Sequence, residues 1–467
     1  MSETIAAVAT GAAVSAIGIV RLSGEDAIAF ADALFRPQSG VPMRESEAHK
    51  LVYGSLYTRA GELLDICLCT VSRAPHSYTG EDTAEFQCHG SPVVLRTLLD
   101  ELFALGARQA LPGEFTKRAF LNGRMDLSSA EAVADLIDAE SAESAKNAAG
   151  QLAGALATRT EGVYSLLTDI SAHYHAVLDY PDEDIEPFRL ESYEHSLEQA
   201  CAELRALLAT YERGKLMNAG IPAVIVGRPN AGKSSLLNAL LGYDRAIVTH
   251  VPGTTRDTIE EKLRLGKICL RLIDTAGLRE TDDEVERLGV ERSRSAMERA
   301  ELLIAVVDGS EALTAEDEAI LAAAEGAKRA IVVLSKKDLS ESAALRTSLP
   351  VVKVSSVTGE GVEALGAAIE AMFPLPDVPA GGILTNARHA EAISRALDFL
   401  GSALRAMREG ATPDVVLTES EGSMAALGEL DGRTVREDVT NRIFSRFCVG
   451  KYTLTRLCPC ANISGQR

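Results

Sequence analysis

Short runs of apolar and β-branched residues alternate with helical patterns through the central part of the chain. The runs lie at residues 221–226, 268–274, 302–308, 330–334 and 350–354. Strands of this kind, separated by amphipathic helices, predict a doubly wound parallel sheet with helices on its faces. Ligands of such sheets bind beyond the carboxyl ends of the strands. We therefore expect the chemistry of this segment in the loops that follow the runs.

The chain on either side of this segment shows other patterns. Before about residue 120, strand-like runs precede a helical pattern over Pro92–Leu105, which predicts a mixed α/β domain. From Asp126 the pattern is helical, and Ser128 with Glu131 has the spacing of a capping box. Helical spacing returns near the other end of the chain, at residues 386–407 and 436–447.

These patterns predict three domains, in line with a length of 467 residues and roughly 150 residues per domain. An N-terminal mixed α/β domain covers residues 1–120. A helical domain is formed in two parts, 121–215 and 377–467, and the doubly wound domain at 216–376 is inserted between them. Because the termini of a domain usually lie close together, such an insertion disturbs its host little.

The segment Gly227–Ser234 reads G-R-P-N-A-G-K-S and joins the first apolar run to a helical pattern. In that setting the motif predicts a phosphate-binding loop, whose glycines let backbone N–H groups face a polyphosphate at a helix N-terminus. Lys233 would reach the terminal phosphates, and the Ser234 hydroxyl would bind Mg²⁺. An ordinary glycine turn is the alternative, but the flanking strand and helix favour the phosphate loop.

Further loops fit guanine-nucleotide chemistry. Asp274–Gly277 (D-T-A-G) offers a carboxylate near Mg²⁺ and a glycine amide for the γ-phosphate, and Thr255 offers a hydroxyl ligand for Mg²⁺. Asp338 in S-K-K-D can accept hydrogen bonds from guanine N1 and N2, which adenine cannot supply. The backbone at Ser355 and Ser356 can bind the guanine oxygen. Each of these short motifs alone is weak evidence for a GTPase. Their order along the chain after a phosphate loop nevertheless predicts one.

The composition narrows the functional classes. A net charge of -20 argues against a broadly basic surface, so an RNA partner would bind through a local patch or a helper protein. The sequence has neither a run of 18 apolar residues nor a signal-peptide pattern. The eight cysteines form no C-x-x-C pair, which favours the reducing cytoplasm. Cys67 and Cys69 alternate along a predicted strand, where buried small residues are more usual than metal ligands.

The combined motifs resemble the bacterial GTPases of the Era and TrmE group. Further segments make the resemblance more specific, to the tRNA-modification GTPase family MnmE, also called TrmE. These segments are Ser77–Asp82, Pro112–Thr116, Arg118–Gly123, Leu127–Ala132, Asp283–Arg287 and Phe447–Lys451. The resemblance spans essentially residues 1–451.

The resemblance implies a set of residues that hold the nucleotide and its ions. In addition to Mg²⁺, it implies K⁺ bound by Asn230, Thr249, Thr254 and the carbonyl near Val251, in place of an arginine finger. The expected GTP-binding residues are Asn230, Ala231, Gly232, Lys233, Ser234, Ser235, Thr249, Val251, Thr254, Thr255, Asp274, Thr275, Ala276, Gly277, Lys336, Asp338, Ser355 and Ser356.

Two residues match catalytic positions of the family. Glu286 matches the glutamate that orients the attacking water; because its neighbours are acidic, a solvated helix charge is the alternative. Cys448 lies among basic residues, where a thiol can be reactive, although a small residue packed at a helix end is equally simple. The family's cysteine at this position favours chemistry. In this family two nucleotide domains meet face to face during hydrolysis, which implies a homodimer.

The N-terminal domain is similar to the family's folate-binding module. Arg21, Glu85, Arg124 and Lys451 match positions that hold 5-formyl-tetrahydrofolate; as alternatives, Glu85 is an edge-strand charge and Arg124 a helix-capping charge. The implied reaction adds an aminomethyl or carboxymethylaminomethyl group at C5 of the tRNA wobble uridine (U34). In the family this requires a folate one-carbon unit and an FAD-containing partner, MnmG (GidA), in a heterotetramer.

Three features depart from the family pattern. Ser335 replaces the usual asparagine at the start of the guanine loop (Ser335–Asp338), so we expect a weaker hydrogen bond between this loop and the phosphate loop. Residues 10–16 lack the family's glycine-rich turn before Arg21. Residues 452–467 continue beyond the family's usual last lysine, as a natural extension, a frameshift or a cloning scar, and their C-P-C sequence alone is a poor metal site.

A function from another class fits the same GTPase motifs. An Era-like ribosome-assembly GTPase would use its flanking domains to bind RNA without modifying it. The acidic composition and the N-terminal segments favour the modifying enzyme. Binding of 5-formyl-tetrahydrofolate separates the two, because an assembly factor should have no affinity for it.

Overall fold

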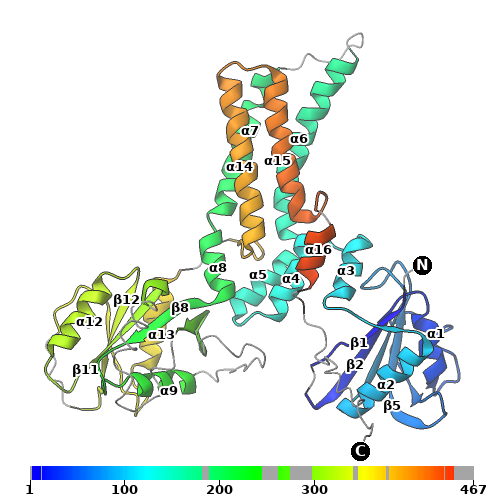
Figure 1. The fold of residues 1–467 in the computed structure, drawn as a ribbon, viewed down its shortest axis with the longest axis horizontal. Helices are drawn as coiled ribbons and strands as arrows, with labels where there is room; N and C mark the ends of the chain where they lie inside the picture. Colours follow the sequence, from blue (N-terminus) through cyan, green and yellow to red (C-terminus); the bar gives the residue numbers. More distant parts are fainter. Residues whose placement is uncertain are drawn as a thin grey trace, which may run out of the picture. The chain divides into compact units, whose positions relative to one another are not determined.

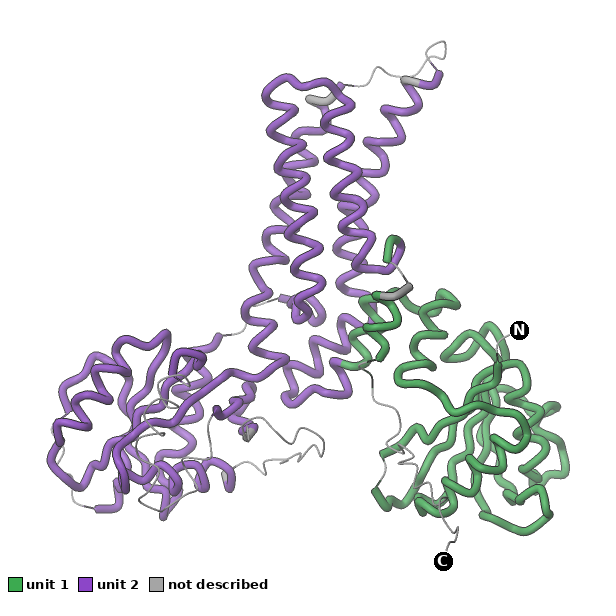
Figure 2. Tube along the Cα trace, viewed as in Figure 1, with its two compact units in different colours: residues 1–134, 434–467 green, residues 135–433 purple. Residues whose placement is uncertain are grey.

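The structure is a computed structural model that describes residues 3–11, 13–180, 189–243, 261–273, 297–339, 345–374, 378–435, 437–445 and 447. The chain forms two compact units (Figure 2). The first consists of Met1–Ala134 and Thr434–Arg467, and the second of Asp135–Arg433. The three-domain division expected from the sequence stays a prediction, and each unit is described separately.

The first unit contains a seven-stranded sheet of order β3-β4-β5-β6-β2-β1-β7. Neighbouring strands pair antiparallel except β1 and β7, which are parallel. Helix α2 packs on the sheet through Leu95, Leu98 and Leu102, which repeat at helical spacing and are buried. The elements are β1 (Ile5–Val8), β2 (Ser15–Ser23), α1 (Ala27–Leu34), β3 (Phe35–Pro37), β4 (Val52–Tyr57), β5 (Leu63–Ser72), β6 (Thr83–Gly90), α2 (Pro92–Leu105) and β7 (Arg108–Gln109).

A small aromatic core in the same unit joins segments that are far apart in the sequence. Helix α3 (Glu114–Leu121) contributes Phe120, and α16 (Glu437–Phe444) contributes Phe444, with ring centroids 6.3 Å apart. Gly113, which precedes α3, has φ 64°, and a Cβ there would lie 2.8 Å from the Phe444 carbonyl oxygen. Only glycine allows this approach together with this backbone conformation.

Helix α4 (Leu127–Ile137) begins differently from the expectation. Ser128 lies inside the helix, and the capping side chain is Asp126, whose Oδ1 accepts from the Ser129 N–H at 2.7 Å. The Ser128 hydroxyl donates to the same carboxylate at 2.7 Å. The predicted capping box was therefore wrong, because an aspartate two residues earlier accepts the free N–H group instead.

The helical part of the second unit is held by a long apolar core. Figure 1 shows α14 and α15 side by side. A Cβ on Gly422 of α15 would lie 2.7 Å from the Phe399 ring of α14, so the glycine lets these two helices pack closely. The helices are α5 (Ala142–Leu152), α6 (Ala155–Asp179), η1 (Leu190–Tyr193), α7 (Glu194–Leu208), α8 (Tyr211–Ala219), α14 (Ala387–Arg408) and α15 (Pro413–Asp431).

The two connections of the inserted segment meet at one place in this helical part. The Thr210 hydroxyl oxygen, just before α8, accepts from the Leu384 N–H at 3.0 Å. Gly214 on α8 packs directly on Leu384, where a Cβ would clash with the carbonyl oxygen. From α5, Gln151 donates to the Ile383 carbonyl at 2.7 Å. The chain therefore leaves and rejoins the helical part at neighbouring positions.

The inserted segment forms a six-stranded sheet of order β13-β12-β11-β8-β10-β9. Strands β8, β10, β11, β12 and β13 pair in parallel, as predicted, whereas β9 is an antiparallel edge strand that the pattern did not predict. The elements are β8 (Ile221–Val226), α9 (Lys233–Tyr243), β9 (Glu261–Leu265), β10 (Ile268–Leu272), β11 (Leu302–Asp308), α12 (Ala315–Glu325), β12 (Ala330–Ser335), β13 (Val351–Lys353) and α13 (Val362–Met372). None of the described helices is both long and apolar enough to cross a membrane.

Candidate functional site: the nucleotide loops and an N-terminal arginine site

The predicted phosphate loop follows β8 and leads into α9. Gly227 lies so close to the neighbouring strand β11 that a Cβ would be 2.5 Å from the Val306 carbonyl oxygen. Asn230 and Gly232 both have positive φ, at 62° and 96°. These left-handed residues turn the chain sharply before the helix, in the way that aims successive backbone N–H groups into a concave anion site.

Lys233 is the first residue of α9, and its ammonium group folds back over the loop. It donates to the carbonyl oxygens of Gly227 at 2.7 Å and Arg228 at 2.8 Å. Partial burial lowers the pKa of Lys233 from its ordinary value. The side chain is therefore already held at the mouth of the loop, where it can exchange these carbonyls for phosphate oxygens. Ser234 and Ser235 follow in the exposed first turn of the helix.

The guanine loop is attached directly to the phosphate loop. Ser335, buried at the end of β12, donates from its hydroxyl to the Ala231 carbonyl oxygen at 2.6 Å. The serine hydroxyl therefore forms a direct bond to the phosphate loop, and the weaker hydrogen bond expected from the missing asparagine stays a prediction. The two loops are thus connected by a direct hydrogen bond between them.

Ser355 organises the remaining part of the base site. It is fully buried, and its hydroxyl donates to the Asp338 carboxylate at 2.6 Å while accepting from the Thr358 N–H at 3.2 Å. Asp338 is exposed, and its carboxylate is therefore oriented by Ser355 and reachable from solvent. Ser356 lies beside it, partly exposed. The arrangement suits a carboxylate that accepts two N–H groups of a flat base.

Asp308, at the end of β11, was not singled out by the sequence and links both loops electrostatically. Its carboxylate accepts from the Lys336 ammonium at 2.5 Å and lies 3.8 Å from the Arg228 guanidinium. Burial would raise the pKa of Asp308, but hydrogen bonds from Lys336 and Ser310 outweigh it and hold the pKa below its ordinary value. The signal available in the sequence was its position at a strand end.

Several predicted residues lie outside the described residues. These are Thr249, Val251, Thr254, Thr255, Asp274, Thr275, Ala276, Gly277, Glu286, Cys448 and Lys451. The described members of the predicted GTP site are Asn230 to Ser235, Lys336, Asp338, Ser355 and Ser356. They lie in the loops that follow the carboxyl ends of β8, β12 and β13.

The N-terminal site is centred on Arg21. Arg21 on β2 is directly opposite Glu85 on β6, and its Nε donates to Glu85 Oε1 at 2.6 Å. Its guanidinium carbon lies 5.4 Å from the Tyr78 ring centroid and 5.7 Å from that of Phe115. The arginine is thus held between a carboxylate and two aromatic rings, which restrains a long side chain that remains 30% exposed.

The segments that contribute Tyr78 and Phe115 also contact one another and neighbouring segments. Tyr78 and Thr116 share a hydrogen bond between their hydroxyls at 3.0 Å. The Arg118 guanidinium, 11% exposed, donates to Glu81 at 2.7 Å. Arg124 lies against the same loop, since a Cβ on Gly80 would be 3.3 Å from its Cγ. Tyr78, Phe115, Glu81 and Arg118 lie within the segments that resemble the family, but the sequence did not predict them as site residues.

Comparison with known proteins places this chain in one family. The model described as GTP-binding protein TrmE N-terminus matches residues 4–124, and that described as MnmE helical domain matches residues 127–448. The tRNA modification GTPase MnmE of Symbiobacterium thermophilum is 44% identical over 456 residues, which cover 96% of this chain and 99% of that protein. Its namesakes from Roseiflexus sp. and Heliobacterium modesticaldum are each 42% identical over 466 residues, covering 96% and 97% of this chain and 99% and 100% of theirs. The chain therefore belongs to the MnmE family of tRNA modification GTPases.

Proposed function

We propose that this protein hydrolyses GTP in the modification of tRNA, as a K⁺-activated enzyme that acts on the wobble uridine. As a member of a family of tRNA modification GTPases, it is a GTP hydrolase. The observation that carries the proposal is the Ser335–Ala231 hydrogen bond, which joins the guanine loop to the phosphate loop in a chain that is similar to an MnmE protein over 96% of its length. The K⁺ requirement and the reaction at the wobble uridine go beyond what membership of the family shows, and both are proposed here.

The phosphate loop fits a nucleotide. The close approach at Gly227 and the positive φ of Asn230 and Gly232 leave room for phosphates near backbone N–H groups. Lys233 exchanges its contacts with loop carbonyls for the terminal phosphates. Asp338, oriented by Ser355, accepts the guanine N–H groups.

Two cations would be held by residues of this loop and of segments outside the described residues. Ser234 and Thr255 are the proposed Mg²⁺ ligands, and Asn230, Thr249, Thr254 and the Val251 carbonyl are the proposed K⁺ ligands. Bound there, the two ions supply positive charge that offsets the charge developing on the phosphates. Glu286 orients the attacking water.

The Arg21 site fits a folate. A carboxylate oxygen accepts more than one hydrogen bond, so Glu85 can bind N–H groups of a pterin while it keeps Arg21. Arg21 and Arg124 suit the carboxylates of the glutamate tail, and Lys451 is the proposed fourth residue. Tyr78 and Phe115 add aromatic faces beside Arg21. When bound, the folate supplies a one-carbon unit.

The proposal includes partners. Two copies of the chain would form a homodimer whose nucleotide domains meet during hydrolysis, and an FAD-containing partner, MnmG, would join them in a heterotetramer. GTP hydrolysis then moves domains rather than supplying a phosphate to the product. Cys448 is the proposed reactive thiol. The product is uridine 34 with an aminomethyl or carboxymethylaminomethyl group at C5.

Mass analysis of wobble nucleosides tests the proposal directly. A strain deleted for this gene should lack the modified uridine, and the wild-type chain should restore it. Lys233→Ala should not restore it, because the phosphate loop is then without its cation. Wild-type nucleoside levels in the deletion strain would reject the modifying function. An Era-like assembly role predicts that outcome, and no feature of the described residues favours it.

Potassium dependence is tested with the purified chain. GTP hydrolysis should fall sharply when Na⁺ replaces K⁺ at the same ionic strength, and Asn230→Ala should remove the difference between the salts. Equal rates in both salts would exclude K⁺ activation while leaving the tRNA function untouched.

A further inference from the structure

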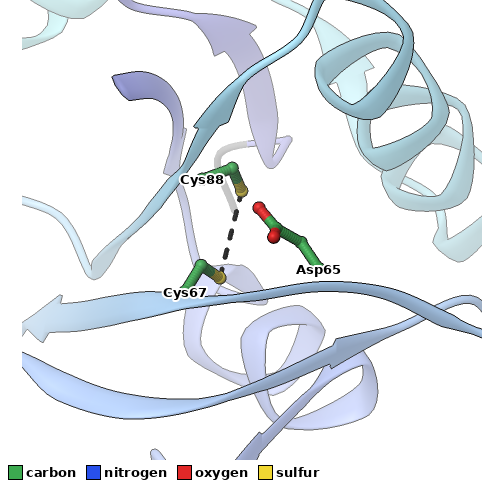
Figure 3. Close-up of side chains that lie close together, drawn as sticks. All are labelled: Asp65, Cys67 and Cys88. Atoms are coloured by element: carbon green, nitrogen blue, oxygen red, sulfur yellow. Dashed lines mark hydrogen bonds between the residues drawn. The ribbon is translucent and has the colours of Figure 1, made fainter. Parts of the chain in front are cut away.

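The sheet of the first unit contains a cluster of three side chains with metal-ligand chemistry (Figure 3). Asp65 and Cys67 are two residues apart on β5, and Cys88 is on the neighbouring strand β6. One ligand atom from each lies within 4.8 Å of the other two. Cys67 and Cys88 are 5% and 2% exposed, and the Asp65 side chain is 10% exposed.

We propose that Asp65, Cys67 and Cys88 bind a divalent cation of the zinc class, with solvent in the fourth position. Two sulfurs and one carboxylate oxygen are a soft donor set, which selects zinc-like ions over Mg²⁺ or Ca²⁺. Zinc sites with three protein ligands keep the fourth position of a tetrahedron for water.

The sulfur separation suits this ion. Zinc–sulfur bonds of about 2.3 Å place two sulfurs of a tetrahedron about 3.8 Å apart. The Sγ atoms of Cys67 and Cys88 are 4.0 Å apart, so little movement is needed. A disulfide would require them to approach to about 2.05 Å. The two strands already hold the thiols at the spacing of metal ligands.

His89 fixes the orientation of the carboxylate ligand. Its backbone N–H donates to Asp65 Oδ2 at 2.9 Å, and its Nδ1 lies 2.8 Å from Asp65 Oδ1. The strand pairing of β4 and β5 is irregular next to Asp65, where Leu56 pairs with Asp65 and Tyr57 with Leu63. Metal-binding side chains are commonly held by such outer hydrogen bonds. His89 is therefore assigned as a positioning residue.

Without a cation the two cysteines are a pair of thiols. The Cys88 thiol donates to the Cys67 sulfur, with 4.0 Å between the two Sγ atoms. A divalent cation replaces one proton on each sulfur, so binding releases two protons and forms two metal–sulfur bonds. No oxidant is involved. The alternative is that Cys67 and Cys88 are simply small residues buried in the core. That alternative does not require the Asp65 carboxylate beside the two sulfurs.

Cobalt titration of the full chain tests the site. The chain would carry serine at Cys448, Cys458 and Cys460, so that these thiols cannot contribute, and would first be freed of metal. Adding Co²⁺ should give one equivalent of a thiolate-to-cobalt charge-transfer band, and Zn²⁺ should displace it. Cys67→Ala with Cys88→Ala should abolish the band. Cys69→Ala, a buried cysteine on the same strand outside the cluster, should leave it intact.

Two milder variants keep the test valid if the double cysteine variant does not fold. Asp65→Asn, which preserves shape, and His89→Ala, at an exposed position, should each weaken metal affinity about 10- to 100-fold with unchanged circular dichroism. The proposal is overturned if the chain binds no stoichiometric Co²⁺ or Zn²⁺, or if the band persists in the double variant. A Cys67–Cys88 disulfide, seen by mass spectrometry in chain purified without reductant, would also overturn it.

Discussion

The Ser335 hydroxyl donates to the Ala231 carbonyl oxygen at 2.6 Å and lies 3.1 Å from the Val307 carbonyl. One side chain at the end of β12 thus contacts both the phosphate loop and the neighbouring strand β11. Because Ser335 is buried, water would not take the place of its hydroxyl on the Ala231 carbonyl if that hydroxyl were removed. The guanine loop and the phosphate loop are therefore expected to move as one body when a nucleotide binds.

Removing this hydroxyl should weaken nucleotide binding. Ser335→Ala leaves the buried Ala231 carbonyl without the Ser335 bond, at a cost of about 1–3 kcal/mol. We expect roughly 5- to 100-fold weaker GDP binding, measured by titration of a fluorescent GDP analogue. Ser335→Asn should bind within a few fold of wild type, and the exposed Ser192→Ala serves as the control. Unchanged affinity in Ser335→Ala would show that the loops are held by other contacts.

The Asp308–Lys336 pair should give the nucleotide domain a dependence on pH. Because the pKa of Asp308 is held below its ordinary value, the pair contributes stability above about pH 4, and this stability is lost as the pH falls through the pKa of the folded state. At pH 7 Asp308→Asn should therefore lower the free energy of unfolding by about 1.5–3 kcal/mol and unfold at a lower temperature than wild type.

The difference between wild type and Asp308→Asn should shrink as the pH is lowered below about 4. Thermal unfolding followed by circular dichroism at several pH values measures it. Asp100→Asn, an exposed change on α2, controls for net charge. A difference that stays constant with pH would mean that shape, not charge, explains the effect.

The Arg21 site predicts the strength of folate binding. Arg21→Ala should weaken binding of 5-formyl-tetrahydrofolate to the full chain roughly 10- to 100-fold, since a hydrogen bond to a charged group contributes about 1.5–3 kcal/mol. Arg21→Lys keeps the charge but not the planar group between Tyr78 and Phe115, so its affinity should be intermediate. Calorimetric titration measures both.

Arg59→Ala is the matched control for the folate experiment. Arg59 also forms an ion pair in the first unit, with Glu101 at 3.0 Å. Neither residue of this pair is among the predicted folate-binding residues. It should bind folate as wild type does. Equal losses in Arg21→Ala and Arg59→Ala would indicate a general effect of charge, and no measurable binding by wild type would remove the folate part of the proposed function.

Gly113 and Gly123 form a natural pair for testing packing between α3 and α16. Both have positive φ, 64° and 67°, but a Cβ would clash only at Gly113, where the Phe444 carbonyl oxygen is 2.8 Å away. Gly123→Ala should lose about 1 kcal/mol of stability from backbone strain alone. Gly113→Ala should lose more, by about 1–3 kcal/mol, in urea unfolding of the full chain. Equal losses of unfolding free energy in the two variants would mean that α16 moves away from the new Cβ at no cost in stability.

The sequence predicted most of the nucleotide domain because its signals are local. β-branched runs marked β8, β11 and β12, and the motifs followed their ends. β9 was missed because Glu261–Leu265 alternates charged and apolar residues, as an edge strand with one exposed face does. Helix α15 was missed because glycines and serines interrupt its pattern, although Gly422 is there to admit the Phe399 ring.

The remaining features depend on contacts between distant residues. Arg21 and Glu85 are 64 residues apart, and only the register of β2 against β6 brings them together. Cys67 and Cys88 meet in the same way across β5 and β6, so the sequence suggested small buried residues but not a shared site. Asp126 displaced the predicted cap at Ser128 because a carboxylate competes well for helix N–H groups.

Thr210, just before α8, is hydrogen-bonded to Leu384, and Gln151 is hydrogen-bonded to Ile383. These bonds hold together the two points at which the chain enters the inserted segment before β8 and leaves it after α13. An inserted segment whose two ends are held together can be cut out and the gap bridged by a few residues, because the helical part already fixes both cut ends. Because Lys262 on β9 also pairs with Glu140, between α4 and α5, at 2.5 Å, a rotation of the nucleotide domain would act on this segment as well as on α8.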